Sequence, residues 1–174
     1  KTLGAILEET EWGRSARDTI NNLTKQYGFE NKITVMFPYG SATLDAEVTK
    51  IKEANPDVLF TGGSAPPDSI LLCKTMKRLG YTPKAIIGQG GPETPAWLEA
   101  VGPMGKYWSI VTKYNWDVAL ANPNAKKVGD AFKAKYGKEF ANEHARAYMC
   151  IYTIYLALEE AGKAADPSDL KAFR

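Results

Sequence analysis

The hydrophobic and polar positions of this chain alternate between two periods. Short apolar runs rich in β-branched residues predict strands, and apolar residues spaced by three and four predict the helices between them. Strands that alternate with helices at this spacing are typical of βαβ units, which place parallel strands in one sheet with helices on both faces. The pattern therefore predicts a three-layer α/β fold. Its five expected strands are Leu3–Leu7, Lys32–Tyr39, Asp57–Gly62, Lys84–Gly88 and Tyr107–Tyr114.

Capping residues mark the expected helix ends. Gly28 should end a first helix, and Pro66 and Pro67 fit the first turn of a later one. Before Gly28, apolar residues recur at helical spacing: Ala16, Ile20, Leu23 and Tyr27.

Beyond the fifth strand the pattern becomes helical. Asn122 and Pro123 predict a helix start, and Gly137 predicts its end. A second helix, at about 142–161, is apolar nearly all round in its middle, so it is expected to be buried on several sides. No linker rich in Pro, Gly or Ser divides the chain, so residues 1–174 are expected to form a single compact α/β lobe.

Composition narrows the class of protein. Apolar residues make up 44% and charged residues 24% of the 174 residues, as in soluble globular proteins. The net charge of +2 is spread along the chain and gives no reason to expect a nucleic acid or an anionic membrane as partner. The apolar stretch Ala147–Leu158 is too short to span a bilayer. Lys1 leads straight into a strand with no export signal, so the start of the chain is expected to be internal to a longer protein.

The two cysteines and the one histidine do not indicate a metal site or redox chemistry. Cys73 and Cys150 lie in separate apolar helical runs, and both are expected to be buried free thiols that are not bonded to each other. His144, the only histidine, has no nucleophile near it in sequence and is expected to make a surface or interhelical hydrogen bond. The sequence therefore predicts no metal ligand and no catalytic residue.

The loops after the strands carry the candidate chemistry, because ligands of open parallel sheets bind at the carboxyl ends of the strands. The Gly-Gly-Ser turn at 62–64 and the Gly-rich stretch at 88–91 match no dinucleotide or P-loop motif, and Asp68 would repel a phosphate. Three acids after the first strand, Glu8, Glu9 and Glu11, are expected to be solvated. What remains is a small-molecule site without chemistry and without a cofactor.

A set of stretches in fixed order then resembles one family. After the first strand stands E-x-x-E-W-G-R-S, and further stretches follow in the same order over nearly all of the chain. These are similar to the type I solute-binding proteins of bacterial ABC importers, most closely to the Leu/Ile/Val-binding group. The further stretches are AEVTKIKEANPDVLFTGG, KRLGYTPKAIIGQGG, NPNAKKVGDAFKAKYGKEF and ARAYMCIYTIYLALEEAG.

The resemblance implies two α/β lobes joined by three crossings, with a ligand held in the cleft between them. The chain would be the second lobe alone, and the first lobe would be its absent partner. The family's aromatic contact before a glycine falls at Trp12, with Glu11 beside it, on what is expected to be a loop. A second contact falls in the loop after the third strand, at Ser64 and Ala65.

A third contact is implied in the loop after the fourth strand, where amino-acid binders of the family place an acid against the ligand's ammonium group. That position is Gly90 here; Gln89 precedes it and the nearest acid is Glu93. This departure leaves open whether the ligand is an amino acid or another organic acid, including an aromatic one.

The expected function is therefore capture of a small solute by the binding component of an ABC importer, without chemical conversion. The resemblance implies importer membrane subunits as partners, and a location in the periplasm or anchored outside the cytoplasmic membrane. Two alternatives stay open: a ligand-sensing effector domain of a regulator or receptor with the same fold, and an enzyme of flavodoxin-like or Rossmann type.

Overall fold

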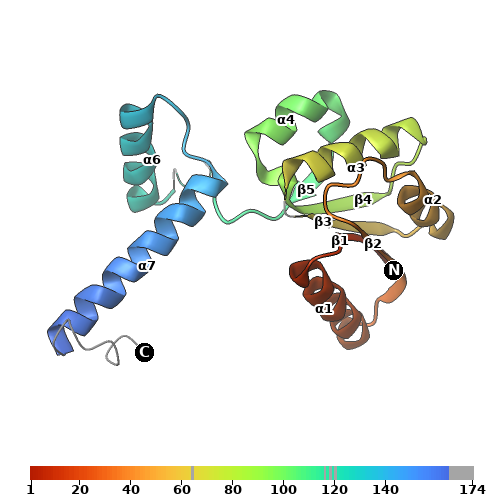
Figure 1. Cartoon of the computed structure of the whole chain (residues 1–174), viewed down its shortest axis with the longest axis horizontal. Helices are drawn as coiled ribbons and strands as arrows, with labels where there is room; N and C mark the ends of the chain where they lie inside the picture. Colours follow the sequence, from red (N-terminus) through yellow and green to blue (C-terminus); the bar gives the residue numbers. More distant parts are fainter. Residues whose placement is uncertain (64, 116, 118, 120, 165–174) are drawn as a thin grey trace. The chain divides into compact units, whose positions relative to one another are not determined.

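A computed structural model of the chain describes residues 1–63, 65–115, 117, 119 and 121–164 (Figure 1). Its contacts form two compact units, Lys1–Thr112 and Lys113–Arg174, and the single α/β lobe expected over residues 1–174 stays a prediction. The described part of the second unit has helices and no strand.

The first unit alternates strands and helices as expected. Its elements in chain order are β1 (Thr2–Glu8), α1 (Glu11–Tyr27), β2 (Glu30–Phe37), α2 (Asp45–Ala54), β3 (Val58–Gly63), α3 (Pro66–Arg78), β4 (Ala85–Gly90), the 3₁₀ turn η1 (Gly91–Glu93), α4 (Pro95–Val101), η2 (Gly102–Gly105) and β5 (Trp108–Ile110).

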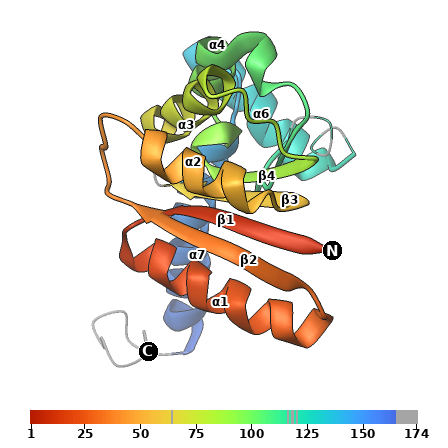
Figure 2. The same ribbon diagram turned by 90° about the vertical axis from the view of Figure 1, so that its right-hand side faces the viewer.

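All five strands are parallel and lie in the order β2-β1-β3-β4-β5. α1 covers one face of the sheet, and α2 and α3 cover the other (Figures 1 and 2). The predicted three-layer parallel α/β fold is thus confirmed for Lys1–Thr112. The fifth strand is shorter than expected, with three residues, because only its first half pairs with β4.

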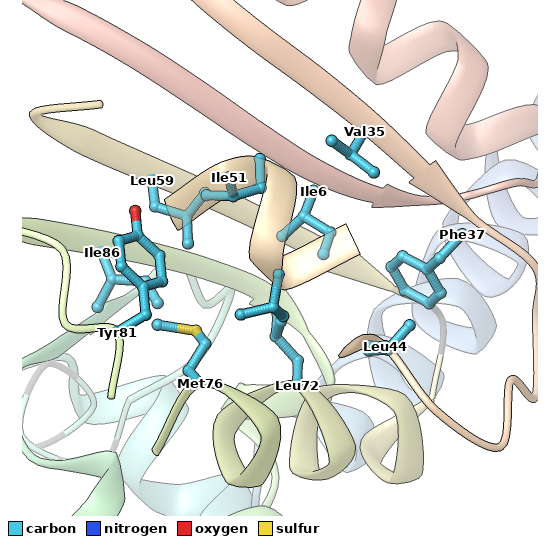
Figure 3. Close-up of a cluster of buried hydrophobic side chains, with 11 residues drawn as sticks. Ile6, Val35, Phe37, Leu44, Ile51, Leu59, Leu72, Met76, Tyr81 and Ile86 are labelled. Carbon is cyan, nitrogen blue, oxygen red and sulfur yellow. The ribbon is translucent and has the colours of Figure 1, made fainter. Parts of the chain in front are cut away.

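The main core lies between the sheet and the α2–α3 layer (Figure 3). Ile6, at the centre of β1, is fully buried, and its neighbours Ala5 and Leu7 are buried on the opposite face of the strand. Side chains from three further strands, from both helices and from the N-cap of α2 fill the space around Ile6; they include Val35, Phe37, Leu44, Ile51, Leu59, Leu72, Met76 and Ile86.

The apolar stripe of α1 is half-buried at Ala16 and Ile20 only. Leu23 and Tyr27 are exposed, and the buried residues of this helix are Gly13 and Thr24. The sequence pattern gives the helical spacing correctly, but it does not say which side of the helix faces the sheet.

The second unit contains α6 (Pro123–Tyr136) and α7 (Asn142–Ala164). The predicted start and end of α6 are confirmed: the Asn122 side chain accepts hydrogen bonds from two backbone N–H groups of the first turn, and Gly137 ends the helix at φ 66°.

The long helix α7 differs from its prediction. Its apolar residues were expected to be buried, yet many of them are exposed, including Tyr148, Met149, Ile151, Ile154, Tyr155 and Leu158. Cys150 is exposed with them and is a free thiol, whereas Cys73 in α3 is a buried free thiol as expected. An apolar pattern all round a helix predicts burial only when the partners that cover it are present.

Candidate functional site

Three loops that were expected to share a site meet at one edge of the sheet. β3 lies between β1 and β4, and its end pairs Leu7 with Gly62 on one side and Gly63 with Gly90 on the other. Since parallel strands end at the same edge, the segments that follow β1, β3 and β4 come together there. We call this surface the carboxyl edge; it comprises residues 8–12, 62–65 and 89–93.

Trp12 lies on the carboxyl edge, but on a helix rather than on a loop. α1 begins at Glu11 because the Thr10 hydroxyl accepts a hydrogen bond of 3.2 Å from the Gly13 N–H and so caps the helix. The Trp12 ring lies against the backbone of Gly62, where a Cβ would sit 2.3 Å from Cη2 of the ring. Trp12 is still 38% exposed. The ring thus covers the end of β3 and leaves an aromatic surface open to solvent.

The Glu11 side chain pairs with a residue of its own helix. Its carboxylate forms an ion pair with Arg14 at 3.1 Å, one helical turn further along, and its side chain is 93% exposed. A direct role of Glu11 toward a ligand stays a prediction.

The segment after β3 turns tightly into α3. Ala65 is the N-cap residue of α3 and is half-buried, with Pro66 in the first turn. The Ser69 hydroxyl donates to the Pro66 carbonyl at 2.9 Å and closes this turn. Ser64, the other predicted contact here, lies outside the described residues.

The glycines after β4 allow the backbone to pack closely against the segment after β3. Gly90 has φ 89°, and a Cβ there would lie 1.8 Å from the Gly63 carbonyl oxygen. A Cβ on Gly91 would lie 2.1 Å from Oγ of Ser69. These glycines are therefore required by backbone contact, which explains the Gly-rich stretch without a phosphate.

The other two predicted contact residues near the end of β4 are partly exposed to solvent. Gln89 and Glu93 are both half-buried, Gln89 near the end of β4 and Glu93 at the end of η1. The structure brings Trp12, Ala65, Gln89, Gly90 and Glu93 to the same edge of the sheet, but contact of any of them with a ligand stays a prediction.

Two acids at the carboxyl edge are buried. Glu8 is fully buried, contrary to the expectation that the three acids after β1 are solvated; only Glu9 and Glu11 are exposed. Asp68, in the first turn of α3, is 4% exposed. Burial and then the neighbouring Glu8 carboxylate raise the pKa of Asp68 above its ordinary value, and a backbone hydrogen bond from Gly40 partly opposes this.

The described cavity next to the carboxyl edge is small. The cavity beside Thr61 and Asp68 measures about 10 Å³. A cavity of about 390 Å³ lies instead at the amino ends of β4 and β5, next to Tyr81 and Trp108, where burial raises the pKa of Tyr81 to about 12. Small-molecule sites enclose most of a ligand, so the edge would need a second wall to do so.

His144, which lies outside the carboxyl edge, has structural contacts. The Ala141 N–H donates to Nδ1 of His144 at 2.9 Å, and the imidazole ring lies 4.5 Å from the Phe132 ring. This agrees with the hydrogen-bonding role expected for His144. Within the described ranges, no three His, Cys, Asp or Glu residues gather as they would around a metal ion.

Sequence reasoning missed two residues of the site. Gly62 was taken as part of a turn, although it is where the Trp12 ring rests. Asp68 was considered only as a charge that would repel a phosphate, although it is buried near Glu8. The run of two glycines at the end of β3 was the one available signal, since glycine in a strand often marks a close approach.

Comparison with known proteins gives a consistent result. The chain is 27% identical over 173 residues to the Leu/Ile/Val-binding protein homolog 8 of Brucella abortus, covering 97% of this chain and 42% of that protein. It is 25% identical over 146 residues to homolog 7 of Brucella suis, covering 82% of this chain and 36% of that protein. The chain therefore spans less than half the length of these relatives.

Solved structures agree in fold. A leucine binding protein of Thermotoga maritima superposes with a TM-score of 0.81 at 27% identity, covering 93% of this chain and 45% of that one. A type 1 periplasmic binding protein of Bordetella pertussis superposes with a TM-score of 0.78 at 25% identity, covering 99% of this chain and 48% of that one. No helix among the described residues is both long and apolar enough to cross a bilayer. The periplasmic binding protein family model matches residues 1–173, and the chain belongs to that family.

Proposed function

We propose that this chain is part of the solute-binding component of an ABC importer. It captures a small amino acid or organic acid, aromatic acids included, without converting it. Family membership supports the binding role, and the relatives with leucine or Leu/Ile/Val in their names support the solute class. The observation that carries the proposal is the carboxyl edge itself. There, a partly open Trp12 ring on Gly62 faces solvent beside the half-buried Gln89 and Gly90.

Each residue of the carboxyl edge has a proposed role. The Trp12 ring supplies a flat apolar contact surface, and the segment at Ser64 and Ala65 supplies hydrogen bonds. Gln89 supplies a polar partner, and Glu93 is the nearest acid for a ligand ammonium group. Gly90 lets the ligand approach the backbone, and Glu11 contributes negative charge at the rim.

A second lobe is the proposed partner that closes the site. The chain spans 42% of one relative and 45% of one solved structure, so those proteins have more than half their length beyond the matching part. The exposed apolar residues of α7 support this partner, because a helix that is apolar nearly all round is stable when it is buried. We propose that the absent lobe covers α7 and supplies the other wall of the ligand cleft.

We propose the membrane partners and the location of the protein on the same grounds. Solute capture for an ABC importer requires contact with the importer's membrane subunits, and the family name indicates the periplasm as the place. No catalytic group is assigned, because the relatives are binding proteins.

Thermal shift measurements on the two-lobe protein test the proposal. A panel of the twenty amino acids and a series of aliphatic and aromatic carboxylates is screened, and each solute that stabilises the protein is titrated by calorimetry. One solute class should raise the melting temperature and bind at one site per protein. Turnover of a solute, or stabilisation by a nucleotide alone, would contradict the proposal.

A further inference from the structure

A cavity of about 390 Å³ lies at the end of the sheet opposite the carboxyl edge. Ile86 and Trp108, near the amino ends of β4 and β5, form part of its wall. Along β4, about 13 Å of strand separates Ile86 from Gly90 at the carboxyl edge. The volume of the cavity is within the range of small-molecule sites, about 300–1,000 Å³. The cavity and the carboxyl edge are therefore separate surfaces of the first unit.

Part of the cavity wall is apolar and aromatic. Met76 of α3 and Met104 of η2 line it together with Trp108. The Trp108 ring is half-buried and packs on the fully buried Trp97, with ring centroids 5.0 Å apart. Thioether sulfurs and an indole ring both make favourable contacts with aromatic groups. This wall therefore favours a ligand that carries an aromatic ring.

The charged residues of the cavity all have the same sign. Three exposed lysines line it, and no Asp or Glu does; they are Lys77, Lys84 and Lys106. Lys84 is compensated, because its ammonium group pairs with Asp57 at 2.5 Å. Among the described residues, neither Lys77 nor Lys106 forms an ion pair with an acid. Two such ammonium groups beside an apolar wall fit a ligand with a carboxylate.

Tyr107, between Lys106 and Trp108, has an unfavourable backbone conformation. Its φ is 71°, in the left-handed region that a residue with a side chain adopts at a cost. The side chain is 83% exposed, so packing does not offset this cost. The Lys106 ammonium group lies 5.0 Å from the centroid of the Tyr107 ring, which places an aromatic face and a positive charge together. Residues strained in this way cluster at ligand clamps.

We propose that this cavity is a second small-molecule site, which binds a small aromatic carboxylate independently of the carboxyl edge. The ring of the ligand lies against Trp108 and the two methionines, and its carboxylate faces Lys77 and Lys106. Tyr107 covers the ligand from the rim, and this contact offsets the cost of its backbone conformation. The proposal does not rest on solute capture at the carboxyl edge, because no residue of that surface lines the cavity.

NMR titration of the two-lobe protein with cinnamate tests the site. The indole N–H signal of Trp108, assigned from a spectrum of Trp108→Phe, should shift with a Kd of about 0.1–1 mM, as expected for a ligand of this size. The Trp12 indole signal reports binding at the carboxyl edge in the same spectra. Cinnamamide has the same ring and no charge, so it should bind about fivefold more weakly. A shift of Trp12 without a shift of Trp108, or equal affinity for cinnamamide, overturns the proposal.

Substitutions of exposed residues then locate the ligand. The double variant Lys77→Gln/Lys106→Gln should raise the Kd for cinnamate about fivefold. The matched control Lys25→Gln/Lys50→Gln removes the same charge from two exposed lysines outside the cavity and should leave the Kd unchanged. Tyr107→Gly should raise the Kd about threefold, while the melting temperature stays the same or rises, because glycine adopts a positive φ readily. An unchanged Kd in either cavity variant, or an equal loss in the lysine control, overturns the proposal.

Discussion

Replacement of Trp12 by alanine should weaken solute binding and also destabilise the fold. Trp12 is 38% exposed, so 62% of its surface is already buried, in part against Gly62. Full truncation of a buried Trp costs about 3–5 kcal/mol, and the buried share of Trp12 scales this to about 2–3 kcal/mol of unfolding free energy. The melting temperature should fall by roughly 4–12 °C, at 2–4 °C per kcal/mol for a domain of this size. This differs from a Trp on an open loop, whose removal would leave stability nearly unchanged.

The effect on affinity adds to the effect on stability. Truncation of an aromatic anchor at a binding site costs about 2 kcal/mol or more, which is about a thirtyfold rise in Kd. Calorimetric titration of the two-lobe protein, with the best solute of the thermal shift panel, gives the Kd at a temperature where both forms are folded. Thermal melts of the same samples give the stability.

Two control variants separate the causes. Trp12→Phe keeps an aromatic face on Gly62 and should retain most of the affinity and stability. Tyr27→Ala removes a 65% exposed ring at the far end of the same helix and should change neither quantity. A Trp12→Ala protein with lower melting temperature but unchanged Kd would refute the binding role and leave Trp12 as a packing residue.

Three further substitutions test the geometry around the site and the exposed helix. Gly62→Ala places a methyl group 2.3 Å from the Trp12 ring, so the ring must move. Calorimetry should then show a loss of affinity similar to that of Trp12→Ala. An unchanged Kd would show that the position of the ring does not matter for binding. Gly90→Ala would place a methyl group 1.8 Å from a backbone carbonyl oxygen, at a residue with φ 89°. It should lower the unfolding free energy, measured by urea titration, by at least about 2 kcal/mol. The control Gly28→Ala, also at positive φ but with open space around it, should cost about 1 kcal/mol. Ile151 is 68% exposed in the 174-residue chain, so Ile151→Ala should destabilise that chain by less than about 0.5 kcal/mol. In the two-lobe protein the same change should cost about 2–4 kcal/mol of unfolding free energy. Equal effects in both would mean that no second lobe covers this residue.

Local sequence determined the positions of most elements. Asn122 and Gly137 bound α6 as predicted, because a side-chain cap and a glycine at positive φ act within one turn of the chain. The five strands were found because β-branched apolar runs and Gly-rich ends are also local signals. Family resemblance pointed to the three loops of the site because the matching stretches include them.

Only the tertiary structure decided which of these residues meet and which are buried. The contact of Trp12 with Gly62 joins residues 50 positions apart, and it exists because β1 and β3 are neighbours in the sheet. Glu8 reads as one of three loop acids, yet the pairing of β1 between β2 and β3 draws it into the interior, where it meets Asp68. Burial depends on what packs against a residue, and packing depends on contacts distant in sequence. For the same reason, the apolar pattern of α7 could specify a helix that needs a partner, but not the partner.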